Sequence, residues 1–123
     1  MATGTVSQFK NQNLQAERLD LKNGTGTCST NAVTINAAAG VITTESLTTA
    51  AGSSQAITLT NSFIASTDML FVHQNGGTST TGTLEIKSVP GSGTATITLT
   101  NRHASAAFNG TFILAFLVVK KQA

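Results

Sequence analysis

Two nearly identical stretches, AITLTN at residues 56–61 and TITLTN at residues 96–101, decide the fold class of this chain. Apolar and hydroxyl side chains alternate in both, so an extended strand places Ile57 and Leu59 on one face and Thr58 on the other. The side chains of a strand alternate with this period of two residues when one face of its sheet is buried and the other is exposed to solvent. The stretches therefore predict two strands, and they favour an all-β protein.

The same alternation returns along the chain from residue 32 onward. Small or turn-forming residues separate the predicted strands. The sequence PGSG at residues 90–93 predicts a tight hairpin, because proline fixes φ and glycine allows positive φ. Short strands at this spacing are typical of a sandwich or a barrel. The predicted strands are residues 33–36, 41–47, 56–61, 68–74, 82–89, 96–101 and 111–120.

Residues 1–31 differ from the rest of the chain, because they are polar and show no sustained helical or strand period. We expect an amino-terminal arm at residues 1–31, flexible alone or pinned against a partner, and one β domain at residues 32–123. Residues 1–9 lack the basic start and apolar run of a signal peptide, so we expect no export by such a signal. The apolar anchors of the arm are Val6, Phe9, Leu14, Leu19 and Leu21.

The last predicted strand breaks the alternation, because residues 112–119 are all apolar. Both faces of a strand with this composition must be dry. One face packs into the core, and the other requires cover from a loop, from the amino-terminal arm or from another subunit. The sequence leaves open whether that cover comes from the same chain or from a second subunit.

Composition limits the classes of partner. Charged residues make up 10% of the 123 residues, against about 25% in typical domains. The net charge of +2 is small and dispersed, and the chain has neither Tyr nor Trp to stack on bases, so we predict no nucleic-acid partner. We also predict no membrane partner, because the longest apolar stretch is far shorter than the roughly 20 residues that span a bilayer. A surface of Thr, Ser, Asn and Gln suits close contact with other protein.

The residues that could carry catalysis or bind a metal are few and scattered. His73 and His103 lie in different segments without a second ligand type nearby, so no metal site is predicted. Cys28 is the single cysteine, which excludes an intramolecular disulfide, and its polar, flexible setting makes it a bystander thiol. We therefore predict no catalytic residue, no cofactor and no enzyme, since the carboxylates also occur singly. These carboxylates are Glu17, Asp20, Glu45, Asp68 and Glu85.

Repeated Thr-x-Thr at residues 58–60 and 96–100 also suggests a flat ice-binding face. That mechanism needs the motif at a regular coil period, whereas dissimilar segments separate the two copies here. The ice-binding interpretation is therefore the less favoured one.

Several runs of the chain resemble small virion structural proteins of tailed bacteriophages. They are NAVTIN at residues 31–36, GVITTESLTTAAG at 40–52, ITLTNS at 57–62, NGTF at 109–112 and FLVVK at 116–120. Among these virion proteins, the chain most resembles the head decoration (cement) proteins, over roughly residues 31–120. The runs are structural, so no functional residue is carried over from the family.

The resemblance implies an antiparallel β-sandwich, jelly-roll-like and with about eight strands, preceded by an extended amino-terminal arm. It implies homotrimers on the outer capsid surface, made in the host cytoplasm, with the major capsid protein and other copies of this chain as partners. Such a protein stabilises the shell by bridging capsomers. We hypothesise that the arm contacts the shell and that the last strand contacts other copies. The proposed interface residues are Phe9, Leu14, Leu19, Leu21, Ile113, Leu117 and Val119.

The main alternative is a tail-fibre or receptor-binding module. In that case loops at residues 75–81 and 101–109 would contact host glycans, although the chain lacks the Trp and Tyr rings that usually stack on sugars. A secreted adhesive β module is a third interpretation, weakened by the missing signal peptide. The sequence does not distinguish a jelly roll from an immunoglobulin-like sandwich, because both use short alternating strands with similar turns.

Overall fold

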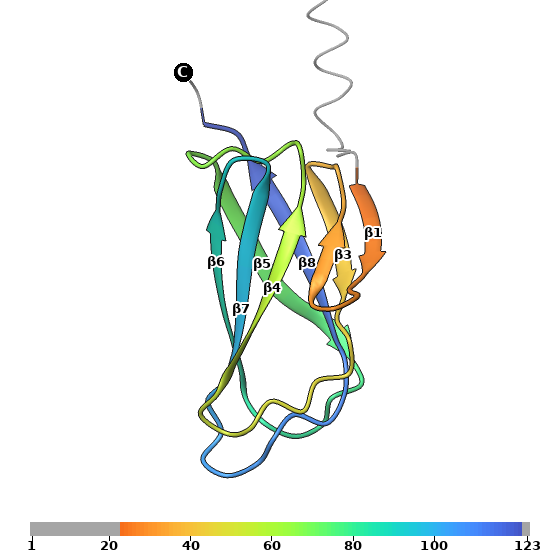
Figure 1. The fold of residues 1–123 in the computed structure, drawn as a ribbon, viewed down its shortest axis with the longest axis vertical. Helices are drawn as coiled ribbons and strands as arrows, with labels where there is room; N and C mark the ends of the chain where they lie inside the picture. Colours follow the sequence, from red (N-terminus) through yellow and green to blue (C-terminus); the bar gives the residue numbers. More distant parts are fainter. Residues whose placement is uncertain (1–22, 122–123) are drawn as a thin grey trace, which may run out of the picture.

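Residues 23–121 are described by the computed structural model, and this part of the chain is all-β (Figure 1). Eight strands form two four-stranded mixed sheets, and no helix occurs among residues 23–121. The first sheet has the order β1-β3-β8-β5, with bounds Asn23–Thr27, Ala39–Thr43, Phe112–Val119 and Met69–Gly77. The second has the order β2-β4-β7-β6, with bounds Ala32–Thr34, Ser54–Thr60, Thr94–Asn101 and Leu84–Pro90. The predicted arm residues Phe9, Leu14, Leu19 and Leu21 lie outside the described residues.

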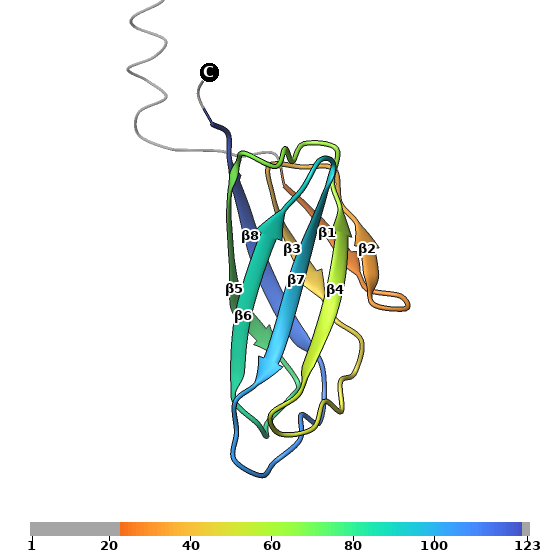
Figure 2. The ribbon, with the colours of Figure 1, turned by 60° about the vertical axis from the view of Figure 1, so that its left-hand side comes forward.

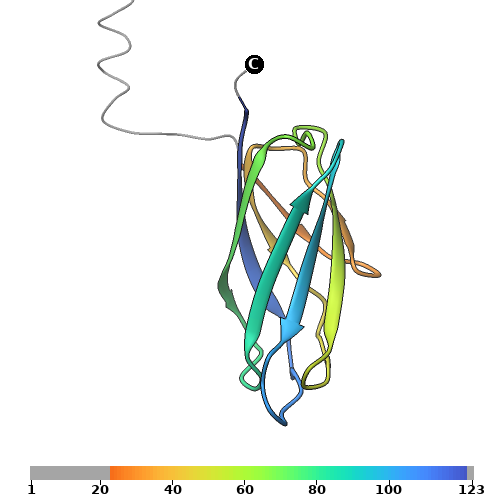
Figure 3. The ribbon, with the colours of Figure 1, turned by 90° about the vertical axis from the view of Figure 1, so that its left-hand side faces the viewer.

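The two sheets face each other and enclose one hydrophobic core (Figures 2 and 3). Ile42 of β3 and Leu114 of β8 enter it from the first sheet. Ile57 of β4 and Ile97 of β7 enter it from the second, and all four side chains are 1% exposed or less. Burying a side chain of this size stabilises the fold by about 1.5–3 kcal/mol relative to leaving it exposed. This shared burial joins the two layers.

The two stretches that decided the fold class are the central strands of the second sheet. β4 and β7 pair antiparallel, with Ile57 opposite Ile97 and Thr58 opposite Thr96. The predicted hairpin joins β6 to β7, and the N–H of Gly91 donates to the carbonyl of Thr94 at 2.7 Å. The alternation and the hairpin are therefore both confirmed.

The prediction of purely antiparallel sheets is wrong, and the jelly-roll topology is not confirmed. β1 pairs with β3 in parallel, and β2 pairs with β4 in parallel. The cause is that the chain crosses between the sheets at each of the first steps, from β1 to β2, to β3 and to β4. Each crossing reverses the direction of the chain, so strands that are two steps apart run the same way and pair side by side.

β1 was not predicted as a strand, because its sequence, NGTGT, has no apolar residue. Its inward positions are glycines. A Cβ atom on Gly26 would lie 2.6 Å from Val33 Cγ2, and one on Gly24 would lie 2.9 Å from Ile35 Cγ2. The glycines therefore let the side chains of Val33 and Ile35 fill the space under β1. Residues 23–27, which the sequence placed in the arm, form an edge strand of the first sheet.

Candidate interaction surface

The last strand, β8, is buried on one face and partly exposed on the other. The side chains that point into the core are 5% exposed or less, and they are Phe112, Leu114, Phe116 and Val118. The half-buried side chains that alternate with them are Ile113, Ala115, Leu117 and Val119. β8 lies between β3 and β5, so these residues occupy the middle of the outer face of the first sheet. Three of the predicted interface residues, Ile113, Leu117 and Val119, are thus on one surface, which the described part of the chain does not fully cover.

β5 extends this apolar surface to the edge of the sheet. Met69 lies opposite Val119, and Phe71 lies opposite Leu117. Residues directly opposite each other on paired strands share a face. Met69 is 55% exposed and Phe71 is 56% exposed, which are the largest exposures among the large apolar side chains of residues 23–121. The sequence placed both on one face of a strand, but it did not show that this face points away from the core.

β3 adds two smaller apolar side chains on the other side of β8. Ala39 lies opposite Leu117, and Val41 lies opposite Ala115. Both are half-buried. We call the resulting surface the apolar face. It consists of Ala39, Val41, Met69, Phe71, Ile113, Ala115, Leu117 and Val119.

Polar residues lie around the apolar face on three sides. β1 presents one exposed asparagine and two exposed threonines along one side. His73, opposite Ala115, lies toward one end, where a β-bulge interrupts the pairing of β5 with β8. An ion pair between Asp68 and Lys120 lies at the other end, directly beside the last apolar pair. An apolar centre inside a polar rim is the usual composition of a protein–protein interface.

Asp68 and Lys120 fasten the end of β8 to the loop before β5. Lys120 Nζ donates to Asp68 Oδ2 and to the carbonyl of Phe63, at 2.6 Å in both cases. The N–H of Ala65 donates to the same carboxylate at 2.8 Å. The hydrogen bond from Lys120, followed by that from Ala65, lowers the pKa of Asp68 below its ordinary value. The Asp68 carboxylate therefore stays ionised at neutral pH, and its ion pair with Lys120 forms a charged boundary to the apolar face.

The outer face of the second sheet has the opposite character. β7 presents threonines at positions 94, 96, 98 and 100, and Thr58 and Thr60 of β4 lie opposite Thr96 and Thr94. The two Thr-x-Thr copies therefore lie side by side in the sheet. Their separation along the sequence, which made an ice-binding face the less favoured interpretation, thus no longer counts against it. The strand twist of about 20–25° nevertheless turns neighbouring rows away from a flat lattice. Threonine hydroxyl groups therefore line the part of this face that β4 and β7 form.

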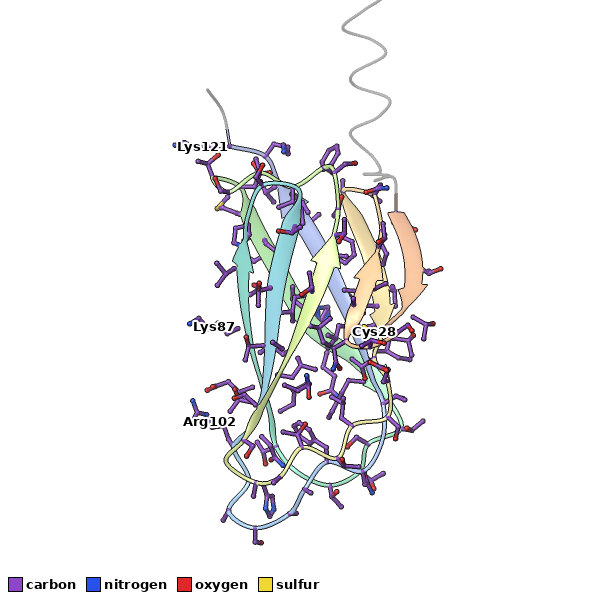
Figure 4. All side chains as sticks on the ribbon, viewed as in Figure 1. Cys28, Lys87, Arg102 and Lys121 are labelled. Carbon is purple, nitrogen blue, oxygen red and sulfur yellow. The ribbon has the colours of Figure 1, made fainter. Side chains whose placement is uncertain are left out.

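The charged side chains of β6 lie on this second sheet, away from the apolar face. Glu85 is opposite Thr100, and Lys87 is opposite Thr98. Arg102 Nη2 contacts Glu85 Oε1 at 2.8 Å, and both side chains are more than half exposed. Figure 4 shows Lys87 and Arg102 on the β6 side of the molecule.

The two loops of the alternative, glycan-binding function lie together at one end of the molecule. Asn109 Oδ1 accepts a hydrogen bond from the N–H of Thr80 at 2.6 Å, and Asn109 Nδ2 donates to Thr80 Oγ1 at 2.9 Å. Asn109 thus joins the segment after β7 to the segment after β5, although residues 75–77 of the predicted loop belong to β5 and Asn101 belongs to β7. The structure brings together two segments that the sequence could only propose separately.

The two histidines lie on different elements. His73 is in β5, whereas His103 is in the loop after β7. His103 Nδ1 accepts hydrogen bonds from the N–H groups of Ser105 and Ala106, at 3.0 and 2.9 Å, so this ring holds its own loop. No group of three His, Cys, Asp or Glu side chains among residues 23–121 is placed to hold a metal ion.

Cys28 lies in the core at the turn between β1 and β2, and not in a flexible polar setting (Figure 4). Burial, together with the Glu45 carboxylate, raises its pKa to about 11. The same carboxylate accepts hydrogen bonds from the N–H groups of Thr30 and Asn31, at 3.1 and 2.6 Å. These bonds hold the turn, in which Thr30 and Asn31 both have positive φ. A thiol that is protonated at neutral pH is a poor nucleophile.

A pocket of about 400 Å³ opens beside Glu45. Its walls are mainly polar and include Asn31, Ser46 and Gln55. Glu45 is the carboxylate in this lining, and its two oxygens already accept the turn hydrogen bonds. The pocket therefore does not offer the paired carboxylates that general acid–base catalysis commonly uses.

Comparison with known proteins finds no match among family models, curated proteins or solved structures. In the described part of the chain, no helix is long and apolar enough to cross a membrane. A functional assignment therefore depends on the surfaces of the molecule itself.

Proposed function

We propose that this chain is a virion decoration (cement) protein, which binds the outer surface of a phage head and stabilises the shell by bridging capsomers. The observation that carries the proposal is the difference between the two outer faces of the body. The first sheet presents the apolar face, whereas the second presents rows of threonine. An exposed apolar patch on a monomer commonly marks a contact with another macromolecule. A body with one adhesive face and one hydrated face suits a protein that assembles with other protein on a shell.

Adhesion through this face costs little desolvation. The eight residues of the apolar face include no Asp, Glu, Lys or Arg, so its burial removes no charge from water. The nearest ion pair, Asp68 with Lys120, stays at the boundary. Contacts that are weak individually hold firmly on a symmetric shell, because many copies bind at once.

The proposed partners are the major capsid protein and other copies of this chain, with a homotrimer on the capsid surface as the assembly. The sequence predicts the shell contact in the arm at residues 1–31. Because residues 23–27 form β1 and Cys28 is in the core, the proposed shell contact is confined to residues 1–22. A truncation that tests the arm must therefore end at residue 22.

Binding to phage heads tests the proposal. The purified full chain is mixed with heads from which this protein has been removed, and the bound copies per head are measured by sedimentation and quantitative gel analysis. We expect saturable binding with at least one copy per capsomer. A chain lacking residues 1–22 is expected to stay folded and to bind much less, whereas the control variant Thr96→Glu, on the threonine face, is expected to bind like the wild type. Absence of binding, or saturation at a few copies per head, would contradict the proposal.

A tail-fibre or receptor-binding module is the second candidate, and the Asn109 contacts favour it. They hold the loop after β5, at Thr80, beside the loop after β7, at Asn109, as a composite glycan-binding surface would require. Binding to a panel of host-surface glycans tests this candidate with the wild type and with Asn109→Ala. Glycan binding that is lost in Asn109→Ala, together with a few copies per particle at the tail, would favour this second function.

A further inference from the structure

We infer that the pocket beside Glu45 binds an organic cation, an alkylguanidinium or alkylammonium group with N–H donors at its head. The walls of the pocket come from Asn31, from the segment after β3 and from the first residues of β4. Its volume is about 400 Å³, and pockets that hold small molecules commonly measure about 300–1,000 Å³. The inference goes beyond the proposed function, because it concerns a separate site and does not require a phage head.

The charge of Glu45 has no counterpart in the described part of the chain, which contains three carboxylates. Asp68 pairs with Lys120 at 2.6 Å. Glu85 pairs with Arg102 at 2.8 Å. No lysine or arginine of the described part pairs with the third carboxylate, Glu45. A negative charge without a cation therefore lies in the wall of a cavity.

The carboxylate of Glu45 is fixed in position and still has acceptor capacity. An ionised carboxylate offers about four lone-pair sites. The two oxygens of Glu45 accept one N–H each, from Thr30 and from Asn31. These bonds hold the side chain, and about half of its acceptor sites are left for a ligand. Hydrogen bonds from a cation to a carboxylate are the strong ones, so an N–H cation is the group that this site favours.

The rest of the lining selects a hydrogen-bonding cation over other ligands. The lining contains no Lys, Arg or His that would hold an anion, and its apolar side chains are those of Leu47 and Ala50. The hydroxyl groups of Ser46, Thr48 and Ser53 make no hydrogen bond to other residues in the described part of the chain. They can therefore accept further N–H groups of the same ligand.

A metal ion suits this pocket less well than an organic cation does. Protein sites for hard divalent cations commonly use several carboxylates, whereas this lining offers one. The pocket also has more room than a single ion needs, and its lining residues Ser46, Thr48 and Ser54 are exposed. A charged head on an alkyl stem can thus reach Glu45 from solvent. The chemistry is the same for a free small molecule and for the arginine or lysine side chain of a partner protein.

Titration of the full chain with n-butylguanidinium tests the inference. n-Butylurea is the matched control ligand, since it has nearly the same shape without the charge. Two-dimensional NMR follows the amides of Thr30 and Asn31, because both donate to Glu45. We expect these amides to shift in a saturable way with a Kd of about 1–20 mM, as for a ligand of this size. Butylurea is expected to bind at least about tenfold more weakly, and added salt is expected to weaken the binding of butylguanidinium.

A variant that fills the pocket with a fixed cation gives a second test. Thr48→Lys leaves Glu45 and its two turn bonds in place, and we expect it to weaken butylguanidinium binding at least about tenfold. Thr96→Lys is the matched control, because Thr96 lies opposite Thr58 and outside the pocket lining. It is expected to bind the ligand like the wild type. Circular dichroism establishes that both variants are folded, and the comparison of the two ligands on the wild type needs no variant.

Equal binding of the two ligands to the wild type would overturn the inference. Unshifted amides at Thr30 and Asn31 would overturn it as well, and so would equal weakening by Thr48→Lys and Thr96→Lys.

Head binding of the same variants identifies the source of the cation. Weaker head binding of Thr48→Lys than of Thr96→Lys would place the cation on a capsid protein, whereas equal head binding would indicate a free small molecule. The titration uses no heads, so the inference and the proposed function can fail separately.

Discussion

Two buried asparagines, Asn61 and Asn101, hold loops at opposite ends of the second sheet. Each ends one of the two similar stretches, and both are fully buried. Asn61 Nδ2 donates to the carbonyl of Ala37 at 2.8 Å, and its Oδ1 accepts from the N–H of Ala37 at 3.2 Å. Asn101 makes four such bonds, of 2.8 to 3.1 Å, to backbone groups of Thr49, Thr83, His103 and Ala106. The side chains thus satisfy loop backbone groups where the regular sheet ends.

Asn101→Ala is expected to lower the free energy of unfolding by about 2–4 kcal/mol. It leaves buried backbone groups without partners, and each such group costs about 1–3 kcal/mol. Urea denaturation followed by circular dichroism measures the change. Thr98→Ala, on the outer face of the same strand, is the control and is expected to change stability by about 1 kcal/mol or less. Equal losses in the two variants would contradict the role of Asn101.

Asp68 links the stability of the fold to pH. Its pKa is lowered in the folded state, mainly by the hydrogen bond from Lys120, so folding favours the ionised carboxylate. This stabilisation is fully present above the pKa of the unfolded chain, which is about 3.9 for an aspartate. It is lost as the pH falls through the lower pKa of the folded state.

Asp68→Asn is expected to unfold at a lower urea concentration than the wild type at pH 7, because it cannot form the ion pair. The difference between the two midpoints is expected to shrink as the pH falls from about 5 to about 2, where the wild-type carboxylate becomes protonated. Urea titrations at several pH values measure both curves. Glu85→Gln is the control, since its exposed pair with Arg102 contributes little. A constant difference across this range would show that Asp68 is not the linked group.

At the scale of the elements, β1 shows how a strand forms without apolar residues. Its glycines point inward and leave room for Val33 and Ile35, while its threonines and asparagine point to solvent. The strand is thus held by its hydrogen bonds to β3 and by side chains that other segments supply. Its glycines have a packing role in the core.

Gly26→Ala is expected to lower the free energy of unfolding by about 1–3 kcal/mol, because the new methyl group overlaps Val33. The sign of this change in the free energy of unfolding is informative, because replacing glycine by alanine usually stabilises a fold by about 0.4–1 kcal/mol where the backbone allows it. Chemical denaturation measures the effect. Thr25→Ala, which changes the outward face of the same strand, is the control. A stabilised Gly26→Ala variant would show that the space under β1 is not filled as described.

At the scale of the whole molecule, the folded body includes residues that the sequence assigned to the arm. β1 completes the first sheet, and Cys28, 6% exposed, belongs to the core. The turn at Thr30 and Asn31 is held by Glu45 from the following segment. Residues 23–31 are therefore integrated with the rest of the fold.

Two truncations test this boundary. A chain lacking residues 1–22 is expected to keep a free energy of unfolding within about 1 kcal/mol of the full chain, because it retains all the core residues of the described part, from Cys28 to Val118. A chain lacking residues 1–31 loses β1, Cys28 and the turn, and it is expected to unfold far more easily, since even a single large-to-small core change costs about 2–5 kcal/mol. Urea denaturation compares the three proteins. Equal stability of both truncations would place the boundary at residue 31 after all.

The sequence alone determined the features that depend on residues close to one another along the chain. Alternation at 56–61 and 96–101 specifies strands because a period of two is a local property, and the turn at 90–93 specifies a hairpin through its own φ preferences. The apolar run of β8 likewise indicated a central strand, although only one of its two faces is fully buried in the described structure. Of the candidate surface, the sequence could therefore supply Ile113, Leu117 and Val119.

Only the tertiary structure decided which strands are neighbours and which side of each faces the core. The pairing of Phe71 with Leu117, the position of Ala39 beside them and the strand character of β1 all depend on partners distant in the chain. The same holds for Asn101, whose side chain bonds to Thr49 across 52 positions. A local pattern carries no information about such partners, because the energy that selects them comes from burial and hydrogen bonding between segments that meet only in the folded molecule.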